Sequence, residues 1–480
     1  AAWIQMHAET CQEAYDNAIQ AFRIAEDDRV RLPVTVCHDG FVVSHTMERV
    51  LALGDEEVRG FVGEFVPPVD LLDTRNPQAV GPLVMPDLAP NLYAQIAEAM
   101  RRAAAVIEEI GQEYGRLTGR AYGLFEAYRL DDAQVALVAM GSVGGTARAV
   151  VDLLRSRGVR AGLLKLRVFR PFPAEALARA LSGSFLRAVA VADKAVELGS
   201  GGPLFSEVTA ALALRARSTG RGLPILINAI LGVGGRDITM ADINAVFRRL
   251  TELAGNGIQP NGDPVYFVDL GGCGGKTLET RNGHRGGADR GPSLRRIVLV
   301  ARGGQGARTA SQFLAQLAIE SGQYAQALPT YGPQRTGAPI KAFAKLSDRP
   351  IDDRQQIYAP DVVVVFDETL LETCADDLRD LADDGVLLVN TRRTPADIRE
   401  MTGLVGRRIH TLDATGIAVS EFGANLPNMA MLAAMVRILG VGELSRLKEA
   451  FQAKMARLSD KMMQGNLRAM DRAEHEFLTV

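Results

Sequence analysis

The stretch Arg296-Ile-Val-Leu-Val-Ala-Arg-Gly-Gly-Gln-Gly306 decides the fold class. Residues 296–301 are predicted as a strand, because the five apolar residues that follow Arg296 are typical of a buried β-strand. The glycines that follow predict a tight turn, and Ala307–Glu320 is predicted as the helix behind it. A buried strand that leads through a turn into a helix is the building unit of α/β domains. We therefore expect a helix-covered sheet in this part of the chain.

The glycine turn is also the first candidate ligand site. Glycine lets the backbone approach a ligand, and the free amides at the start of a helix favour phosphate oxygens. These properties make Gly303, Gly304, Gln305 and Gly306 candidate binding residues. Thr309 stands where a dinucleotide fingerprint has its third glycine, so the spacing is not that of a nicotinamide or flavin site. A plain tight turn is the alternative.

A second candidate is the stretch Tyr331-Gly-Pro-Gln-Arg-Thr-Gly-Ala-Pro339, which Lys341 follows closely. Two prolines and two glycines predict a rigid loop that presents Arg335 and Lys341. The planar guanidinium of Arg335 fits a carboxylate or a phosphate. The alternative is a solvated basic loop.

Outward from this stretch, the same alternation of strand and helix continues in both directions. The apolar runs predicted as strands are 134–140, 161–167, 188–192, 224–228, 361–366 and 385–389. Helices are predicted between them and at 431–438 and 444–476. Such alternation predicts parallel sheets with helices on their faces. The fold class is therefore α/β, with several layered domains and mostly parallel sheets.

Composition breaks divide the chain into four parts. Residues 1–120 are predicted to hold a helix at 9–26, a strand at 32–37, a proline-rich connecting arm at 63–90 and a helix at 91–116. Residues 121–255 and 295–480 are predicted as two α/β domains. Residues 256–294 are predicted as a glycine-rich linker, whose stretch 276–296 carries six basic and two acidic side chains.

Composition excludes several classes of function. Lys and Arg number 54 against 57 Asp and Glu, so no overall basic field attracts nucleic acid or an anionic membrane. The four cysteines include no C-x-x-C pair, which argues against disulfides, a zinc knuckle or an iron–sulfur cluster within this chain. No apolar run is long enough for a membrane span, and no signal peptide is predicted. We expect a reduced, cytoplasmic location.

Three further patterns carry no chemistry of their own. The stretch Gly271-Gly-Cys-Gly-Gly-Lys-Thr277 lacks the spacing of a phosphate loop, because Leu270 stands where the first glycine belongs. The six histidines show no metal-ligand spacing, so no metal-binding residue is predicted. Ser44 and His45 are adjacent, and adjacent side chains of a strand point to opposite faces. We therefore predict a loop-structuring role for them rather than a nucleophile–base pair.

Taken in order, five motifs resemble the 2-oxoacid:ferredoxin oxidoreductases, and the pyruvate branch most of all. They are Asp39-Gly-Phe…Ser44-His45, Gly141-Ser-Val-Gly-Gly-Thr146, Leu231-Gly-Val-Gly-Gly-Arg-Asp237, Arg302-Gly-Gly-Gln-Gly306 and Tyr331-Gly-Pro-Gln-Arg-Thr-Gly-Ala-Pro339. Residues 1–255 resemble the α component and 295–480 the γ component. The resemblance implies a thiamine pyrimidine-type part, then a transketolase C-terminal-like domain at 121–255, then a γ-type domain.

The resemblance also implies an activity that several chains share. The family cleaves a 2-oxoacid with thiamine diphosphate and Mg²⁺, passes electrons to iron–sulfur clusters and transfers the acyl group to coenzyme A. The β component brings the diphosphate site with its Mg²⁺, [4Fe-4S] clusters lie on partner chains, and the γ component closes over coenzyme A. The resemblance therefore implies that this chain is an αγ subunit of a dimerised hetero-oligomer. Its expected partners are a β-type chain and a ferredoxin-like subunit or ferredoxin. Gly303–Gly306 and Arg335 become candidate contacts for the phosphates or the adenosine end of coenzyme A.

The resemblance leaves other points open. The family's activating Glu and its substrate residues correspond to sequence upstream of Trp3, so no catalytic residue is assigned and the chain is expected to be the downstream part of a longer one. A pyruvate-like substrate is favoured, with an aromatic or branched 2-oxoacid such as phenylglyoxylate as the alternative. The electron acceptor, ferredoxin or NAD, stays open. The rival functions are a non-catalytic assembly or docking subunit and, more weakly, a free nucleotide-binding protein.

Overall fold

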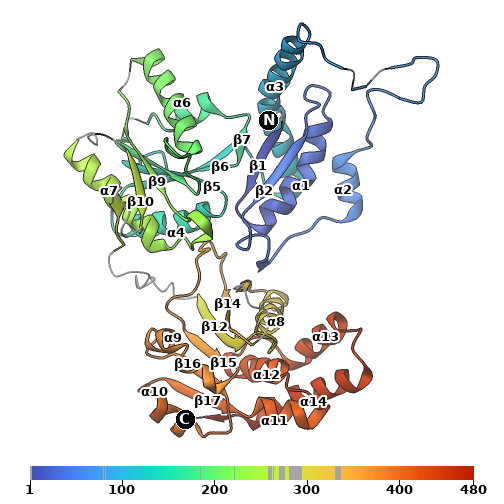
Figure 1. Cartoon of the computed structure of the whole chain (residues 1–480), viewed down its shortest axis with the longest axis vertical. Coiled ribbons are helices and arrows are strands. Elements are labelled where there is room, and N and C mark those ends of the chain that lie inside the picture. Colours follow the sequence, from blue (N-terminus) through green and yellow to red (C-terminus); the bar gives the residue numbers. More distant parts are fainter. Residues whose placement is uncertain are drawn as a thin grey trace. The chain divides into compact units, whose positions relative to one another are not determined.

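The structure is a computed structural model that divides into two compact units (Figure 1). Unit 1 comprises residues 1–39 and 50–280, and unit 2 comprises residues 40–49 and 281–480. The structure describes residues 3–78, 80–81, 83–183, 185–220, 222–257, 262, 264–269, 276–280, 294–329 and 337–479. The chain thus enters unit 2 briefly at Gly40 before it completes unit 1.

The first part of unit 1 is a small sheet with long helices beside it. Its elements are β1 (Ile4–Ala8), α1 (Cys11–Glu26), β2 (Val34–His38), α2 (Asp55–Val62), α3 (Ala89–Thr118) and β7 (Val168–Arg170). The strand order is β2-β1-β7, with β1 parallel to β2 and antiparallel to β7. Helix α1 begins two residues later than predicted, because the Thr10 side chain accepts a hydrogen bond from the Glu13 amide and caps the helix.

The second part of unit 1 is a seven-stranded sheet between two layers of helices. Its elements are β4 (Phe125–Tyr128), β5 (Val135–Met140), α4 (Val143–Ser156), β6 (Ala161–Leu166), α5 (Ala174–Ala180), β8 (Ala188–Asp193), α6 (Pro203–Thr219), β9 (Ile225–Ile230), η1 (Val233–Gly235), α7 (Met240–Asn256), β10 (Val265–Val268) and β11 (Thr277–Leu278). The order is β11-β10-β9-β8-β5-β6-β4, and only β4 is antiparallel to its neighbour. Helices α4 and α7 cover one face, and α5 and α6 cover the other. Strands β10 and β11 lie inside the stretch predicted as a linker.

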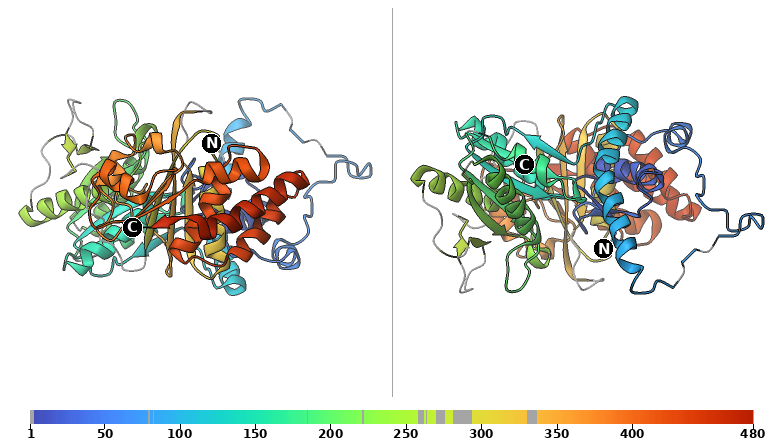
Figure 2. Two further views of the ribbon diagram at one scale, coloured as in Figure 1. Left: turned by 90° about the horizontal axis from the view of Figure 1, so that it is seen from below. Right: turned by 90° about the horizontal axis from the view of Figure 1, so that it is seen from above.

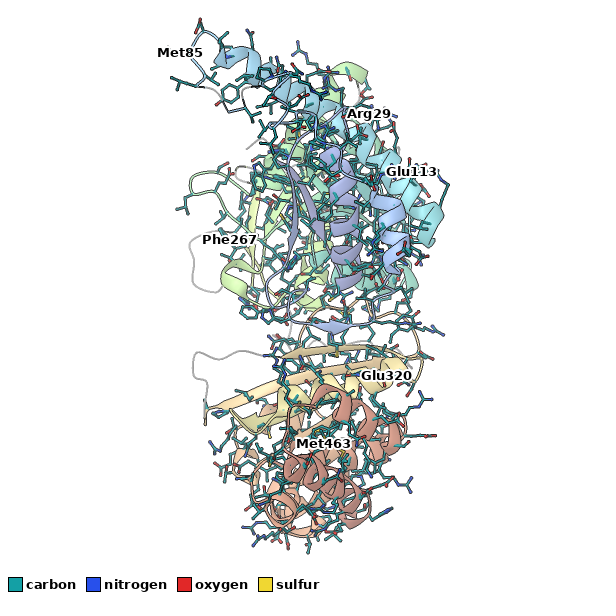
Figure 3. The ribbon with its side chains drawn as sticks, turned by 90° about the vertical axis from the view of Figure 1, so that its right-hand side faces the viewer. Arg29, Met85, Glu113, Phe267, Glu320 and Met463 are labelled. Atoms are coloured by element: carbon teal, nitrogen blue, oxygen red, sulfur yellow. The ribbon has the colours of Figure 1, made fainter. Side chains whose placement is uncertain are left out.

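Between α2 and α3 the described residues form neither helix nor strand, in the stretch predicted as a connecting arm. Large apolar side chains along it are exposed, among them Leu72 at 88% and Leu83 at 88%. Figure 3 shows Met85 on this segment, just before α3. In the described residues, no helix is both long and apolar enough to cross a membrane.

Unit 2 is a single eight-stranded sheet with helices on both faces. Its elements are β3 (Met47–Glu48), β12 (Arg295–Arg302), α8 (Ala307–Glu320), β13 (Tyr324–Pro329), β14 (Pro339–Ser347), β15 (Val362–Val365), η3 (Glu368–Leu370), α9 (Ala375–Arg379), β16 (Val386–Asn390), α10 (Pro395–Thr402), β17 (Arg408–Leu412), α11 (Ala414–Phe422), α12 (Asn428–Leu439), α13 (Leu444–Lys454), α14 (Asp460–Glu476) and β18 (Leu478–Thr479). The order is β18-β17-β16-β15-β12-β14-β13-β3. The predicted strands β12, β15 and β16 run parallel with β17, whereas β14, β13 and β3 add an antiparallel half that the sequence did not predict.

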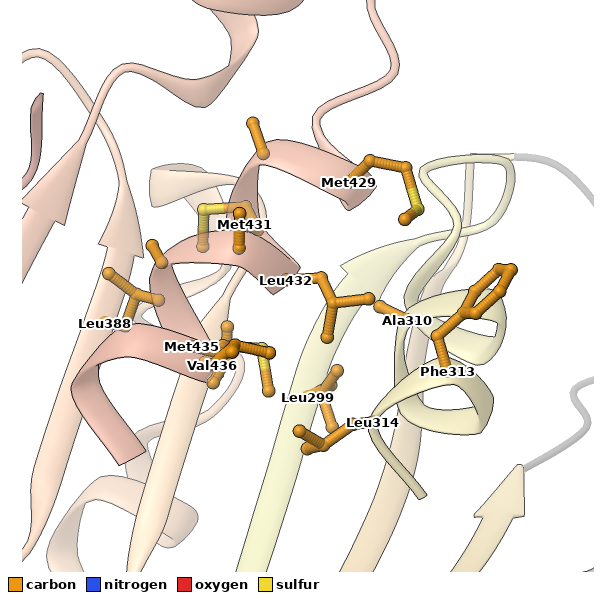
Figure 4. Close-up of a cluster of buried hydrophobic side chains, with 14 of the residues drawn as sticks. Leu299, Ala310, Phe313, Leu314, Leu388, Met429, Met431, Leu432, Met435 and Val436 are labelled. Carbon is orange, nitrogen blue, oxygen red and sulfur yellow. The ribbon is translucent and has the colours of Figure 1, made fainter. Parts of the chain in front are cut away.

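The core of unit 2 lies mainly on one side of this sheet. Helices α8, α11, α12, α13 and α14 pack there, whereas α9 and α10 cover the opposite face (Figure 2). Figure 4 shows Leu432 of α12 beside Leu299 of β12 and Leu314 of α8. The single helix predicted at 444–476 is wrong, because Ser459 caps a new helix by accepting a hydrogen bond from the Met462 amide. Fold class is nevertheless confirmed as α/β with several parallel sheets.

Candidate functional site

The glycine turn of unit 2 lies at a point where the connections of the sheet change sides. Strand β12 leads into α8 on one face, and its parallel neighbour β15 leads through η3 into α9 on the other face. In open α/β sheets, ligands bind in the crevice that such a reversal leaves at the carboxyl ends of the strands. The structure brings four predicted residues to this end of the sheet, because all of them follow β12 directly: Gly303, Gly304, Gln305 and Gly306.

The backbone of the turn depends on its glycines. Gly304 and Gly306 have φ angles of 103° and 81°, which side chains rarely tolerate. The Gly303 amide donates to the Ala338 carbonyl (2.9 Å), and the Gly337 amide donates to the Gly303 carbonyl (3.1 Å). Gly306 is the N-cap of α8, and it has no side chain that could accept a hydrogen bond from the amides of the first turn. Those amides have no partner within the helix and are suited to anionic oxygens.

Arg302, which the sequence did not single out, organises the crevice. Its Nε donates to Asp367 Oδ2 (3.2 Å) and its Nη2 donates to Thr369 Oγ1 (2.8 Å). Its amide donates to Gln305 Oε1 (2.8 Å), so the Gln305 side chain folds back onto its own turn. Burial would raise the pKa of Asp367, but hydrogen bonds from Thr369 and the Arg302 guanidinium lower it overall. This end of the sheet therefore carries an ionised Asp–Arg pair.

Polar side chains continue along the same edge of the sheet beyond β15. Asn390, which ends β16, donates from Nδ2 to the Phe366 carbonyl (2.9 Å) and to Thr415 Oγ1 (2.9 Å). Thr391 donates to the Glu368 carboxylate, and exposed Arg392 pairs with Asp413 (2.9 Å). Each of these groups lies at the end of a buried apolar strand or within three residues after it. That position is the sequence signal that could have revealed them.

The second predicted site residue, Arg335, lies outside the described residues. Lys341, expected beside the same loop, lies within β14, where its Nζ is 2.7 Å from Asp377 Oδ2. Lys341 therefore forms an ion pair with α9, which contains Asp377.

The Ser44 and His45 side chains do not point to opposite faces of a strand, as expected from the sequence, because residues 40–46 form a turn. Ser44 Oγ lies 2.7 Å from His45 Nδ1, since these residues form a turn rather than the strand that would point them apart. The Phe41 amide donates to Ser44 Oγ (2.9 Å), so Ser44 also structures the loop as predicted.

In unit 1, the corresponding end of the sheet binds a carboxylate of the chain itself. Strands β5 and β8 are parallel neighbours whose connections, α4 and α6, lie on opposite faces of the sheet. Asp39 accepts a hydrogen bond from the Ser142 amide (2.7 Å) and pairs with Lys194 (2.8 Å). Burial would raise the pKa of Asp39, but Lys194 and Ser142 lower it overall. The Gly141–Ser142 turn therefore holds an internal carboxylate.

A buried charge cluster in unit 1 was not predicted. Lys165 of β6 lies 3.0 Å from Glu9, 3.2 Å from Glu13 and 3.4 Å from Glu126. Arg148 of α4 also pairs with Glu9 (3.0 Å). Burial would lower the pKa of Lys165, but the three carboxylates raise it overall. The Glu9 and Glu13 carboxylates, at the start of α1, therefore form ion pairs with the side chains of Lys165 and Arg148.

The described residues contain no group of three or more His, Cys, Asp or Glu side chains that could hold a metal ion.

Comparison with known proteins gives the family. Three family models match in sequence: pyruvate flavodoxin/ferredoxin oxidoreductase, thiamine diphosphate-binding, at residues 1–112; pyruvate:ferredoxin oxidoreductase core domain II at 133–243; and pyruvate ferredoxin/flavodoxin oxidoreductase at 296–475. The chain belongs to the 2-oxoacid:ferredoxin oxidoreductase family. It is a fused member of that family, with a γ-like part after the α-type part.

The curated relatives match the α-type part. Pyruvate synthase subunit PorA of Thermotoga maritima is 44% identical over 246 residues, which are 51% of this chain and 61% of the relative. PorA of Methanothermobacter thermautotrophicus is 41% identical over 247 residues, or 52% and 61%. Ketoisovalerate oxidoreductase subunit VorA of Pyrococcus abyssi is 36% identical over 256 residues, or 53% and 62%. The chain therefore spans about three fifths of the length of these family members.

Among solved structures, pyruvate oxidoreductase subunit PORC of Thermotoga maritima is 38% identical in sequence. The match covers 39% of this chain and 98% of PORC, with a TM-score of 0.35.

Proposed function

We propose that this chain is the αγ subunit of a thiamine-diphosphate-dependent 2-oxoacid oxidoreductase. The reaction is the oxidative decarboxylation of a pyruvate-like 2-oxoacid with coenzyme A to acyl-CoA, CO₂ and a reduced acceptor. The match of three family models in the order thiamine-binding, core domain II and γ-like carries this proposal. The PorA relatives favour pyruvate.

Coenzyme A is the proposed ligand of the crevice in unit 2. Its phosphates would meet the amides after Gly306, and Arg335 is the proposed second contact. The open space beside Gly304 supports this placement, since a Cβ there would meet no atom within 4 Å. Arg302 would hold the turn in shape rather than neutralise the ligand, because its charge is already paired with Asp367.

Thiamine diphosphate supplies the carbanion chemistry that releases CO₂. We propose that a β-type partner chain holds its diphosphate and Mg²⁺, that [4Fe-4S] clusters lie on partner chains, and that a ferredoxin-like subunit or ferredoxin accepts the electrons. The assembly is a dimerised hetero-oligomer in the cytoplasm.

A second candidate substrate is a branched 2-oxoacid, which the similarity to VorA favours. A non-catalytic docking subunit is the rival role. Affinity purification of the full-length natural protein from its own cells distinguishes them. We expect a β-type chain with thiamine and iron–sulfur to co-purify and the complex to form acetyl-CoA from pyruvate. If the complex prefers 2-oxoisovalerate to pyruvate, the proposed substrate changes to a branched 2-oxoacid. A complex that is inactive with every 2-oxoacid would contradict the enzymatic role.

The predicted contact of Arg335 has its own test. We expect Arg335→Ala to raise the apparent KM for coenzyme A about 10- to 150-fold, because one charge-assisted phosphate contact contributes about 1.5–3 kcal/mol. Pyruvate-dependent reduction of an artificial acceptor without coenzyme A should stay near normal. Arg457→Ala, at an exposed position after α13, is the matched control. An unchanged KM would remove Arg335 from the site.

A further inference from the structure

A short strand from the α-type part of the sequence completes the sheet of unit 2. Strand β3 lies within residues 1–112, which match the thiamine diphosphate-binding model, whereas its partner β13 lies within residues 296–475 of the γ-like part. The two strands pair antiparallel, with Met47 opposite Ala327. Addition of a strand to the edge of a sheet is a common way in which one polypeptide binds another. The pairing of β3 with β13 therefore has the form of an interface between two proteins.

Side chains on and beside β3 anchor it to unit 2 in three different ways. Met47 packs against the main hydrophobic core of unit 2. Glu48 forms an ion pair with Arg354, in which both side chains are largely buried. The Arg49 guanidinium lies 5.4 Å from the centre of the Tyr324 ring of β13, which is a cation–π contact. Three consecutive residues thus supply apolar, ionic and aromatic contacts, and together these contacts fix the place of the strand on this edge.

The turn before β3 is held in shape by its own hydrogen bonds. The Val42 amide donates to the Gly40 carbonyl (2.8 Å), and Thr46 Oγ1 donates to the Val42 carbonyl (2.6 Å). A segment that is ordered by its own bonds loses less conformational freedom when it binds a partner. Residues 40–46 therefore present β3 in a form that is ready to pair with an edge.

The path of the chain ties this segment to both units. Residues 40–49 belong to unit 2, whereas the residues on either side of them, 1–39 and 50–280, form unit 1. A cut in the chain after residue 280 therefore leaves the N-terminal fragment with one strand in the sheet of unit 2. Without that strand, the outer edge of β13 has unpaired amide and carbonyl groups, since its other edge pairs with β14.

We propose that residues 40–49 are a docking segment, which binds the α-type part to the γ-type part without the covalent connection through residues 281–293. The partner that the docking segment fits is the β13 edge of a γ-type sheet. The segment acts in assembly, so its role is the same whichever 2-oxoacid the enzyme uses and does not depend on the proposed substrate.

The test uses the full chain with the recognition sequence of a specific protease inserted between Arg285 and Gly286. After cleavage, we expect the two fragments to elute together in size-exclusion chromatography at micromolar concentration, with the mass of the uncut chain. Met47→Asp places a carboxylate against the hydrophobic core, so the cut fragments of this variant should separate. Met85→Asp, at a methionine that is 53% exposed before α3, is the matched control and should leave the fragments together.

A milder variant, Glu48→Gln, decides the matter if Met47→Asp unfolds unit 2, which hydrogen exchange in β15 and β16 of the uncut chain reveals. Glu48→Gln keeps the shape of the side chain and removes the charge that faces Arg354. We expect its cut fragments to associate about 10- to 100-fold more weakly than those of the wild type, because Arg354 loses its counterion. Dilution of the cut protein before chromatography measures this change.

Two results would overturn the docking segment. One is the separation of the cut wild-type fragments at micromolar concentration, which would mean that the covalent connection is needed. The other is cut Glu48→Gln protein that stays together as well as the cut wild type does, which would mean that other contacts hold the two fragments.

Discussion

At the scale of single residues, the two positive-φ glycines of the turn differ in what surrounds them. A Cβ on Gly306 would lie 2.6 Å from Asn428 Nδ2, whereas a Cβ on Gly304 would meet open space. Both substitutions carry backbone strain, but only the first displaces the start of α12. Comparing alanine substitutions at Gly304 and Gly306 therefore separates the cost of backbone strain from the cost of a steric clash.

We expect Gly306→Ala to lower the free energy of unfolding of unit 2 more than Gly304→Ala does. The shared strain costs about 1–2 kcal/mol, and displacing Asn428 adds an overpacking cost of about 1–3 kcal/mol. Denaturant unfolding followed by hydrogen exchange in α8 and α12 measures the difference. Equal losses for the two variants would show that Asn428 moves aside freely.

At the scale of elements, Asp39 joins the end of β2 to the start of α4 and to Lys194, which directly follows β8 of the seven-stranded sheet. Its pKa is lowered below the ordinary value, so the carboxylate stabilises the fold above an ordinary Asp pKa of about 3.9, and this contribution is lost as the pH falls through the lower folded pKa. Asp39→Asn keeps the shape of the side chain but removes the charge that faces Lys194.

We therefore expect Asp39→Asn to reduce the free energy of unfolding by about 2 kcal/mol at pH 7 and by less at pH 3. Urea unfolding at the two pH values measures this change. Asp131→Asn, in the exposed turn after β4, is the control. A deficit that persists unchanged at pH 3 would mean that shape, not charge, is what Asp39 contributes.

At the scale of the whole molecule, the sequence predicted what periodicity and turn chemistry encode locally. The predicted parallel strands and the glycine turn follow from such local patterns, and these strands lie within a few residues of their predicted positions. The antiparallel half of unit 2 was missed because β13 and β14 mix polar and apolar residues. The Lys165 cluster and the Arg302–Asp367 pair were missed because each joins residues that are distant in sequence. Only the folded topology brings such partners together.

The same topology makes one short segment important for unit 2. Strand β3 covers the edge of β13, and Glu48 pairs with Arg354, whose side chains are 11% and 8% exposed. Removing one partner of a buried ion pair costs about 3–5 kcal/mol, because the other charge loses its counterion.

We expect Glu48→Ala to destabilise unit 2 by about 3 kcal/mol although residue 48 lies within the sequence of the α-type part. Hydrogen exchange of the full chain should show faster exchange in β13 and β14 and unchanged exchange in β5 and β8. Glu56→Ala, at an exposed pair with Arg59, should change neither set. Equal acceleration in β5 and β8 would show instead that the two units unfold together, and that the 40–49 segment couples their stabilities.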